Sequence, residues 1–289
     1  MKKTMSVTRS NTIAKTITYC ILIAVFIVTI FPIVYAVFAS FKTNLEILTN
    51  PGRIFPKNPT LSNYTTALTS KSFNVPHMLF NSTYYTVANV IITITISSMA
   101  GYVFARGDFP GKKLVFSFFT LLMFVKTGGL EIYPKFEILK ALHMNKGLPA
   151  LLFLHLFGVP TVNMYLVKGF VASLPKELDE VAAIDGCSFI GTFFRITLPL
   201  LKPILATIGI LAFQGSWNEY LMPTVFTSSN PAQQTLIVGL MKLKNSSGAA
   251  TSWNLMLAGS VIALLPVLIA YTVGNKYFVS GLAAGAVKG

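Results

Sequence analysis

The chain has 289 residues, of which 53% are hydrophobic and only 11% are charged, and its formal net charge is +14. An ordinary soluble domain carries about 25% charged residues, so this composition excludes a water-soluble fold, and it excludes a disordered chain because such chains are polar and charged. The cations occur in short groups beside apolar stretches, which indicates juxtamembrane anchoring rather than nucleic-acid binding. We therefore expect an all-α polytopic membrane protein.

Six apolar stretches are candidates for membrane-spanning helices, because a helix needs about 20 apolar residues to cross a bilayer. The first stretch is too long for the core of a signal peptide, and no clear cleavage site follows it. The third is interrupted by Lys126, whose side chain can reach back to the interface. The expected helices cover approximately residues 17–39, 81–104, 112–132, 147–167, 203–226 and 253–273.

An even number of spans places both termini on one side of the membrane. With the N-terminus in the cytoplasm, the cytoplasmic segments hold 13 lysine and arginine residues and the outside segments hold 10, a small bias in the direction of the positive-inside rule. We expect three parts: residues 1–71 with the first span and an outside loop rich in turn-forming residues, a core over 72–275, and a cytoplasmic tail over 276–289.

The loop over 168–202, between the fourth and fifth expected spans, contains the sizeable acidic cluster of the chain. Its pattern predicts a short helix. Pro175 suits the first turn, acidic residues in the early turns complement the helix dipole, and Gly186 suits the left-handed position just beyond the end of a helix.

One face of this short helix is apolar and small. Leu178, Val181 and Ala182 share the face at spacings of three and four, and Ala182 and Ala183 would let another protein surface come close. Such a face, bracketed by acidic charge on the water side of a membrane, indicates a protein-docking helix. A helix lying on lipid headgroups would instead carry cations and aromatic residues.

Three segments carry a resemblance to a known family. E-V-A-A-I-D-G at Glu180–Gly186, followed by L-P-L-L-K-P at Leu198–Pro203, resembles the EAA loop of binding-protein-dependent ABC importer permeases, with Val181 in place of the usual alanine. W-N-E-Y at Trp217–Tyr220 is similar to a segment of carbohydrate-uptake permeases, and Tyr277–Gly289 is similar to the C-terminus of MalG-type subunits. The resemblance covers essentially the whole chain.

This resemblance implies a type-1 ABC importer permease fold and the membrane-spanning subunit of an ATP-driven importer of sugars, specifically oligosaccharides, working by alternating access. It implies a location in a bacterial or archaeal cell membrane with both termini cytoplasmic. The implied partners are a second, MalF-type permease subunit, two cytoplasmic ABC ATPase subunits, an extracytoplasmic sugar-binding protein and the lipid bilayer. The ATPases would dock on residues 175–200 and the tail, at Glu177, Leu178, Glu180, Val181, Ala182, Ala183, Asp185, Gly186, Gly281, Gly285, Lys288 and Gly289.

No phosphate-binding loop of the form G-x-x-x-x-G-K-[ST] occurs in the sequence, nor does a nucleophile–base or metal-ligand constellation. We therefore expect a transporter subunit rather than an enzyme, without a catalytic residue, metal or cofactor of its own. ATP and Mg²⁺ would bind to the partner ATPase subunits.

Glu219 lies deep in the expected fifth span, about 24 Å along the helix from its start. Two interpretations remain open. In one, Glu219 and Asn218 line the outer mouth of a sugar pathway and Trp217 or Tyr220 stacks on a sugar ring. In the other, Glu219 caps a helix or pins the partner subunit, and the two aromatic residues belong to the interfacial belt. His155, alone in an apolar stretch, is interpreted as a hydrogen-bonded packing residue.

Two other functions stay open at this point. A permease of the same architecture could carry a polyol, a glycerol phosphodiester or a peptide, which the ligand of its receptor would reveal. A channel or carrier without an ATPase would need acids or bases paired deep within the spans, and only Glu219 and Lys126 are candidates.

Overall fold

A computed structural model describes residues 2–70, 73–125, 128–144, 146–245 and 252–286. Every regular element in these residues is a helix. Within these residues, three helices are long and apolar enough to cross a membrane, and the number of candidate spans rises to as many as 5 if each of two bent pairs of helices forms one span. The three candidate spans are Ala14–Ala39 within α1 (Lys2–Ala39), the whole of α4 (Val75–Arg106), and Trp253–Gly274 within α15 (Trp253–Ala286). The prediction of an all-α polytopic membrane protein is confirmed, whereas the count of six spans stays a prediction.

Shorter helices connect and flank these three. They are α2 (Asn44–Thr49), α3 (Ser62–Thr69), α5 (Lys112–Phe124), α6 (Ile132–Ala141), α7 (Leu148–Phe157), α8 (Thr161–Ser173), α9 (Glu177–Ile184), α10 (Phe189–Thr192), α11 (Leu198–Leu200), α12 (Lys202–Trp217), α13 (Leu221–Thr227) and α14 (Leu236–Asn245). A π-helical turn, Phe193–Thr197, joins α10 to α11, and a 3-10 turn, Pro231–Gln233, precedes α14.

The third expected span, over 112–132, is not one helix. α5 ends at Phe124 after 13 residues, a length of about 20 Å that falls short of a hydrocarbon core of about 30 Å. Gly128 and Gly129 follow with φ angles of 58° and 99°, and positive φ angles do not occur within a right-handed α-helix. The next helix, α6, begins only at Ile132. The sequence carried a sign of this break, because Lys126 interrupts the apolar stretch and Glu131 lies near its end.

The fourth and fifth expected spans, over 147–167 and 203–226, are each broken. α7 and α8 meet at a bend of 43°, where Pro160 cannot donate a helical hydrogen bond. α12 ends at Trp217, and α13 starts only at Leu221. A second bend, of 78°, separates the helical segment Phe189–Leu200 from α12.

The second expected span begins earlier than its apolar pattern suggested. α4 starts at Val75, so that Pro76 and His77, expected outside the span, form its first turn. The Asn74 side chain caps this turn by accepting a hydrogen bond from the backbone N–H of His77 at 3.0 Å, which satisfies one of the free donors of the helix start.

The chain divides into two compact units, one of residues 1–73 with 240–262 and the other of residues 74–239 with 263–289. In the first unit, Asn63 lies at the centre of a polar cluster. Its amide donates to the carbonyl oxygens of Ser40 and Lys42 at 2.7 and 2.8 Å, and its own carbonyl accepts from the Asn254 amide at 2.7 Å. These contacts anchor α3 against the segment that follows α1.

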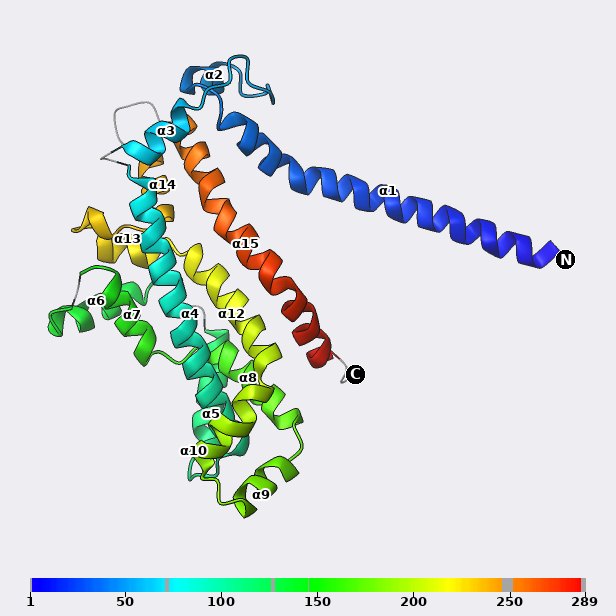
Figure 1. The fold of residues 1–289 in the computed structure, drawn as a ribbon, viewed down its shortest axis with the longest axis vertical. Coiled ribbons are helices and arrows are strands. Elements are labelled where there is room, and N and C mark those ends of the chain that lie inside the picture. The colour runs from blue at the N-terminus through cyan, green and yellow to red at the C-terminus, as the bar shows by residue number, and fades with distance from the viewer. Residues whose placement is uncertain (1, 71–72, 126–127, 145, 246–251, 287–289) are drawn as a thin grey trace. The chain divides into compact units, whose positions relative to one another are not determined.

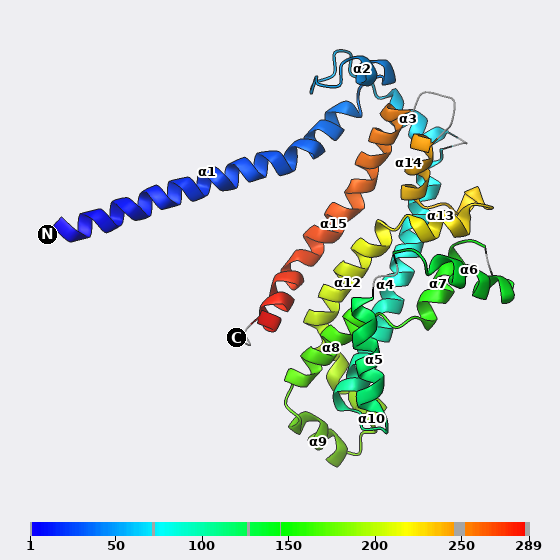
Figure 2. The same cartoon turned by 180° about the vertical axis from the view of Figure 1, so that it is seen from behind.

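In the second unit, α4 packs along α8 and α12 (Figure 1), and the view from behind shows the same neighbours (Figure 2). A glycine permits the close approach of α4 to α8, because a Cβ atom on Gly101 would lie 2.6 Å from the Cβ of Val167. Around this contact lies an apolar core that consists of Tyr102, Val167, Val171, Phe193, Leu201, Ile204 and Ile208.

A row of buried polar side chains runs along α4 at every fourth residue: Asn81, Tyr85, Asn89, Thr93 and Ser97. Successive members of the row lie about 40° apart around the helix axis, so that the row winds slowly around α4. Part of the row is bonded across the unit, since the Asn89 amide donates to the Ser216 hydroxyl at 2.6 Å and the Asn81 amide donates to the Ala232 carbonyl at 2.8 Å. We call these five residues the polar row of α4.

Candidate functional site

The C-terminus of α9 has the left-handed glycine that the sequence predicted. Gly186 has a φ angle of 76°. Its N–H donates to the Ala183 carbonyl at 3.1 Å, and the N–H of Cys187 donates to the Ala182 carbonyl at 2.9 Å. These two bonds form a Schellman motif. A Cβ atom on Gly186 would meet no atom within 4 Å, so the backbone conformation, rather than lack of space, favours glycine here.

The N-terminus of α9 lies two residues after the proline that was expected in its first turn. Lys176 is the N-cap residue and makes no side-chain cap hydrogen bond, while Glu177, Asp179 and Glu180 fill the first turn. Negative charge near these free backbone N–H groups is favourable because it faces the positive end of the helix dipole.

The faces of α9 differ from the expected arrangement in one respect. Ala182 is only 1% exposed and packs against the rest of this chain, whereas Val181 is 57% exposed and Ile184 is 84% exposed. The reason is helical geometry, because neighbouring residues are separated by about 100° around the axis. Ala182 therefore does not share the exposed face, which Leu178, Val181 and Ile184 form instead. We call these three residues the apolar ridge of α9.

The other expected docking positions, in α9 and just after it, are all exposed: Glu177, Glu180, Ala183, Asp185 and Gly186. They surround the apolar ridge with acidic charge and small side chains. The exposed area of the helix thus has the character expected of a protein-docking surface.

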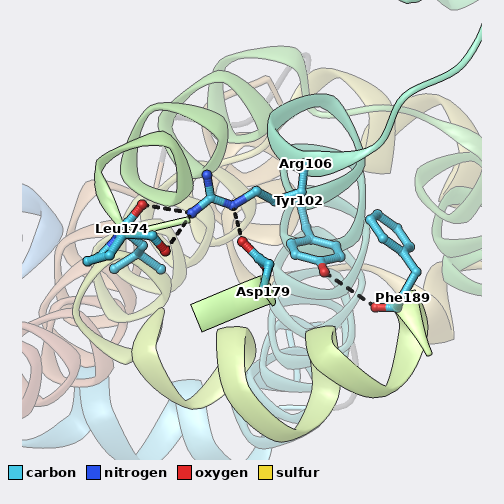
Figure 3. A network of polar contacts seen from close by, with 6 residues as sticks. Tyr102, Arg106, Leu174, Asp179 and Phe189 are labelled. Atoms are coloured by element: carbon cyan, nitrogen blue, oxygen red, sulfur yellow. Dashed lines mark hydrogen bonds and ion pairs between the residues drawn. The ribbon is translucent and has the colours of Figure 1, made fainter. Parts of the chain in front are cut away.

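Arg106, the last residue of α4, holds α9 in place (Figure 3). Its Nε donates to the Asp179 carboxylate at 2.7 Å, and its terminal nitrogen donates to the carbonyl of Leu174 at 2.7 Å. The Arg106 side chain is 10% exposed and that of Asp179 is 29% exposed. One guanidinium group thereby joins the end of α4 to both α9 and the turn that precedes it.

Tyr102, one turn before Arg106, makes the second connection. Its hydroxyl donates to the Phe189 carbonyl at 3.3 Å (Figure 3). Its ring centroid lies 4.6 Å from that of Phe189 and 5.1 Å from that of Phe193. An open groove of about 540 Å³ lies beside these contacts, between the end of α4, α9 and α10. Acids and bases both line it, including Arg106, Asp108, Lys112, Lys176, Asp179 and Glu180.

A second polar cluster surrounds Glu219, within the break between α12 and α13. The Tyr85 hydroxyl donates to Oε2 of Glu219 at 2.5 Å and lies 3.0 Å from Nε2 of His155. Tyr85 belongs to the polar row of α4, and His155 lies in the last turn of α7. One tyrosine thus connects three helical segments, and His155 is the hydrogen-bonded residue that the sequence indicated.

A cavity of about 280 Å³ lies next to this cluster. Both helix breaks contribute to its walls, since Pro160 comes from one and Glu219 from the other. The ion pair of Lys135 with Glu131, at 3.1 Å, lies on the α6 side, and Thr93 lies on the α4 side. The cavity combines charged groups and hydroxyls with apolar side chains, as small-molecule sites do.

The three neighbours of Glu219 lie in different surroundings. Trp217 is 3% exposed, donates from its indole nitrogen to the Ala263 carbonyl at 3.2 Å, and stacks on Phe213. Its ring is therefore a packing element inside the second unit. Asn218 is exposed and donates to the Gln214 carbonyl at 2.9 Å, while Tyr220 is partly buried. Asn218 and Tyr220 line a shallow pocket with Glu219.

The candidate tail residues lie partly outside the described chain. Gly281 and Gly285 belong to the last turns of α15, which continues to Ala286. Lys288 and Gly289 lie outside the described residues, as does Lys126 of the third expected span.

Sequence reasoning missed Arg106, Ile184 and Tyr85. Arg106 was counted only as one of the cations that set the orientation in the membrane. A cation at the end of a span, with an acidic loop farther along the chain, could have indicated an ion pair between the two. The four-residue polar period in α4 could have identified Tyr85. Over the described residues, no group of three or more His, Cys, Asp or Glu side chains is placed to bind a metal ion.

Known proteins share this sequence and fold. Residues 113–283 match the family described as "Binding-protein-dependent transport system inner membrane component". The sulfoquinovosyl glycerol transport system permease protein SmoH of Agrobacterium fabrum is 35% identical over 90% of this chain and 89% of its own length. The trehalose/maltose transport system permease protein MalG of Thermococcus litoralis is 31% identical over 91% of this chain and 93% of its own length.

A solved structure extends the likeness to the fold. The crystal structure of a bacterial ABC transporter involved in the import of the acidic polysaccharide alginate contains a chain that superposes with a TM-score of 0.80. The superposition covers 93% of this chain and 98% of that one at 23% sequence identity. With matching sequence over more than half of its length and the fold of an ABC importer permease, the chain belongs to the binding-protein-dependent transport system inner membrane components.

Proposed function

We propose that this chain is the permease subunit of an ATP-driven importer of sugars, specifically oligosaccharides, and that it forms half of the translocation pathway. The names of its relatives support the solute class, since they transport sulfoquinovosyl glycerol, arabinooligosaccharides and trehalose or maltose. The observation that carries the proposal is the apolar ridge of α9, because an exposed Val181 and Ile184 beside acidic residues form a surface suited to a protein partner.

The partner of the apolar ridge is a cytoplasmic ABC ATPase, which binds ATP and Mg²⁺ and contains the hydrolytic site. Arg106 transmits the movement of a docked α9 to α4, because it bonds to both Asp179 and the backbone at Leu174. α4 has 32 residues and is about 48 Å long. A push on α9 is therefore transmitted along this helix to the polar row.

Two further partners complete the transporter: a second, MalF-type permease subunit and an extracytoplasmic sugar-binding protein. A second copy of the ATPase docks on the MalF-type subunit. The assembly lies in the cell membrane with both termini of this chain and α9 in the cytoplasm. The tail residues Gly281, Gly285, Lys288 and Gly289 run along the ATPase, and Glu219 with Asn218 lines the outer part of the solute pathway.

Docking is tested with two substitutions of equal exposure. Ile184 is 84% exposed on α9, and Leu130 is 83% exposed before α6, on the side expected to face outward. In a pull-down from detergent, Ile184→Asp should lose the ATPase subunits while retaining the second permease subunit, because a charge replaces buried apolar contact. Leu130→Asp should retain both. Equal retention of the ATPase by the two variants would contradict docking on α9.

The solute class is tested separately, by screening the cognate binding protein with sugars, polyols, glycerol phosphodiesters and peptides. Binding of a sugar, and stimulation of ATP hydrolysis by the loaded binding protein in proteoliposomes, are the expected results. A binding protein that takes only one of the other solutes would refute the sugar assignment without affecting the docking proposal.

A further inference from the structure

The cavity beside Glu219 has unused hydrogen-bonding capacity. Tyr85 has one hydroxyl proton, which it donates to Oε2 of Glu219. The contact of 3.0 Å to Nε2 of His155 then requires the ring to donate from Nε2, so that Nδ1 of the neutral imidazole is an acceptor. Oε1 of Glu219 has no hydrogen-bond partner among the residues that the structure describes. Tyr85 therefore orients two side chains that each retain one free acceptor.

The remaining wall of the cavity supplies donors and apolar contact. Lys135 lines the cavity with its ammonium group near Glu131, and the Thr93 hydroxyl belongs to the α4 wall. Leu154 and Pro160 provide apolar surface. A sugar ring has the matching character, because its hydroxyls both donate and accept hydrogen bonds while its C–H groups form apolar patches.

We propose that this cavity is a subsite for one ring of the transported sugar, in which Oε1 of Glu219 accepts a hydrogen bond from a ring hydroxyl. Tyr85 and His155 act as positioning residues that hold the carboxylate in place. The proposal rests on the proposed function, since it places part of a sugar pathway inside this subunit. The volume of about 280 Å³ lies just below the range of about 300–1,000 Å³ for small-molecule pockets, so the site fits a single ring and not an oligosaccharide.

The experiment uses the complete transporter in proteoliposomes and measures three quantities: assembly, ATP hydrolysis stimulated by the loaded binding protein, and uptake of radiolabelled sugar. Glu219→Gln keeps an acceptor for Tyr85 and removes the charge. Uptake should fall about ten- to a hundredfold, the equivalent of one hydrogen bond to a charged group, with stimulated hydrolysis changed less than about twofold. Glu137→Gln on α6, a partly exposed acid paired with Lys140, should leave uptake unchanged.

A second variant fills the cavity without changing any charge. Leu154 lines the cavity, whereas Leu156, two residues later on α7, is 52% exposed and does not. Leu154→Trp should abolish uptake of sugars while the complex still assembles, and Leu156→Trp should transport as the parent does.

The outcomes separate this proposal from the one on which it rests. If the unchanged transporter neither takes up any sugar nor hydrolyses ATP in response to one, the proposed function is wrong and the subsite fails with it. If the unchanged transporter takes up sugar and both Glu219→Gln and Leu154→Trp do so equally well, only the subsite is refuted. Disassembly of the Glu219→Gln complex would also refute it, because Glu219 would then be a structural residue.

Discussion

Replacement of Arg106 by alanine should release α9 from α4, and an undocked helix of 8 residues should unfold locally because so short a helix is unstable on its own. The substitution removes a bond of 2.7 Å to Asp179 and another of 2.7 Å to the Leu174 carbonyl. An ion pair with a partly exposed acid contributes up to about 1 kcal/mol, and a hydrogen bond from a charged group to a neutral acceptor contributes about 1.5–3 kcal/mol. Loss of both should favour local opening of α9 by about 2–4 kcal/mol.

This free energy corresponds to a change of about 30- to 700-fold in the equilibrium between docked and undocked α9. Hydrogen exchange measures it directly at the backbone amides of Gly186 and Cys187, which the Schellman motif protects. In the solubilised complex these amides should exchange faster by that factor in Arg106→Ala. Arg106→Lys should lie between the two, because lysine keeps the charge and loses the planar fork.

Lys113 provides the matched control, since it is an exposed cation in the segment that follows Arg106. Lys113→Ala should leave exchange at α9 unchanged. The double variant of Arg106 and Asp179 should show a coupling energy rather than simple additivity. Unchanged exchange at Gly186 in Arg106→Ala would refute the argument that this arginine holds α9 in place.

Three further substitutions test other parts of the fold. Gly186→Leu places a side chain in the left-handed region at a cost of about 1–2 kcal/mol. In a pull-down we expect this variant to keep its partner permease and lose the ATPase, whereas Gly186→Asn should retain more of the ATPase. Retention of the ATPase at the wild-type level by the leucine variant would sink this prediction. Gly101→Ala brings a Cβ to 2.6 Å from Val167 and should destabilise the complex by about 1–3 kcal/mol in thermal unfolding, while Gly169→Ala, which has nothing within 4 Å, should not. Deletion of residues 281–289 should reduce ATP hydrolysis stimulated by the binding protein without removing the chain from the membrane, and unchanged hydrolysis would show that the tail makes no functional contact.

Local sequence signals predicted the local features of this structure. The apolar stretches identified α1, α4 and α15 because each is one continuous helix through its candidate span. Gly186 was predicted because a left-handed residue after a short helix is decided by the chain within a few residues. Mean hydropathy could not reveal the breaks at Pro160 and after Trp217, since the apolar residues on both sides of each break keep the average high.

Contacts between distant residues were beyond reach of the same reasoning. Arg106 pairs with Asp179 across 73 positions, and Tyr85 bonds to Glu219 across 134. No local pattern states which of several cations or hydroxyls meets a given acid, because that depends on how the helices pack. The assignment of Ala182 to the exposed face of α9 failed for the same reason. The sequence of a helix of 8 residues reveals which positions are apolar, but not which of them face the rest of the chain.

The polar row of α4 has a consequence for the order in which the protein is made. The mean hydropathy of the candidate span in α4 is 1.7, against 2.9 for the span in α1. The value for α4 is lower because Asn81, Tyr85 and Asn89 interrupt its apolar surface. The partner of Asn89 is Ser216, which lies 127 residues later. At a synthesis rate of about 5–20 residues per second, α4 waits roughly 6–25 s for that partner. During this interval the nascent helix needs water, lipid headgroups or the insertion machinery to solvate its amide groups, so membrane integration of α4 is completed only when α12 arrives.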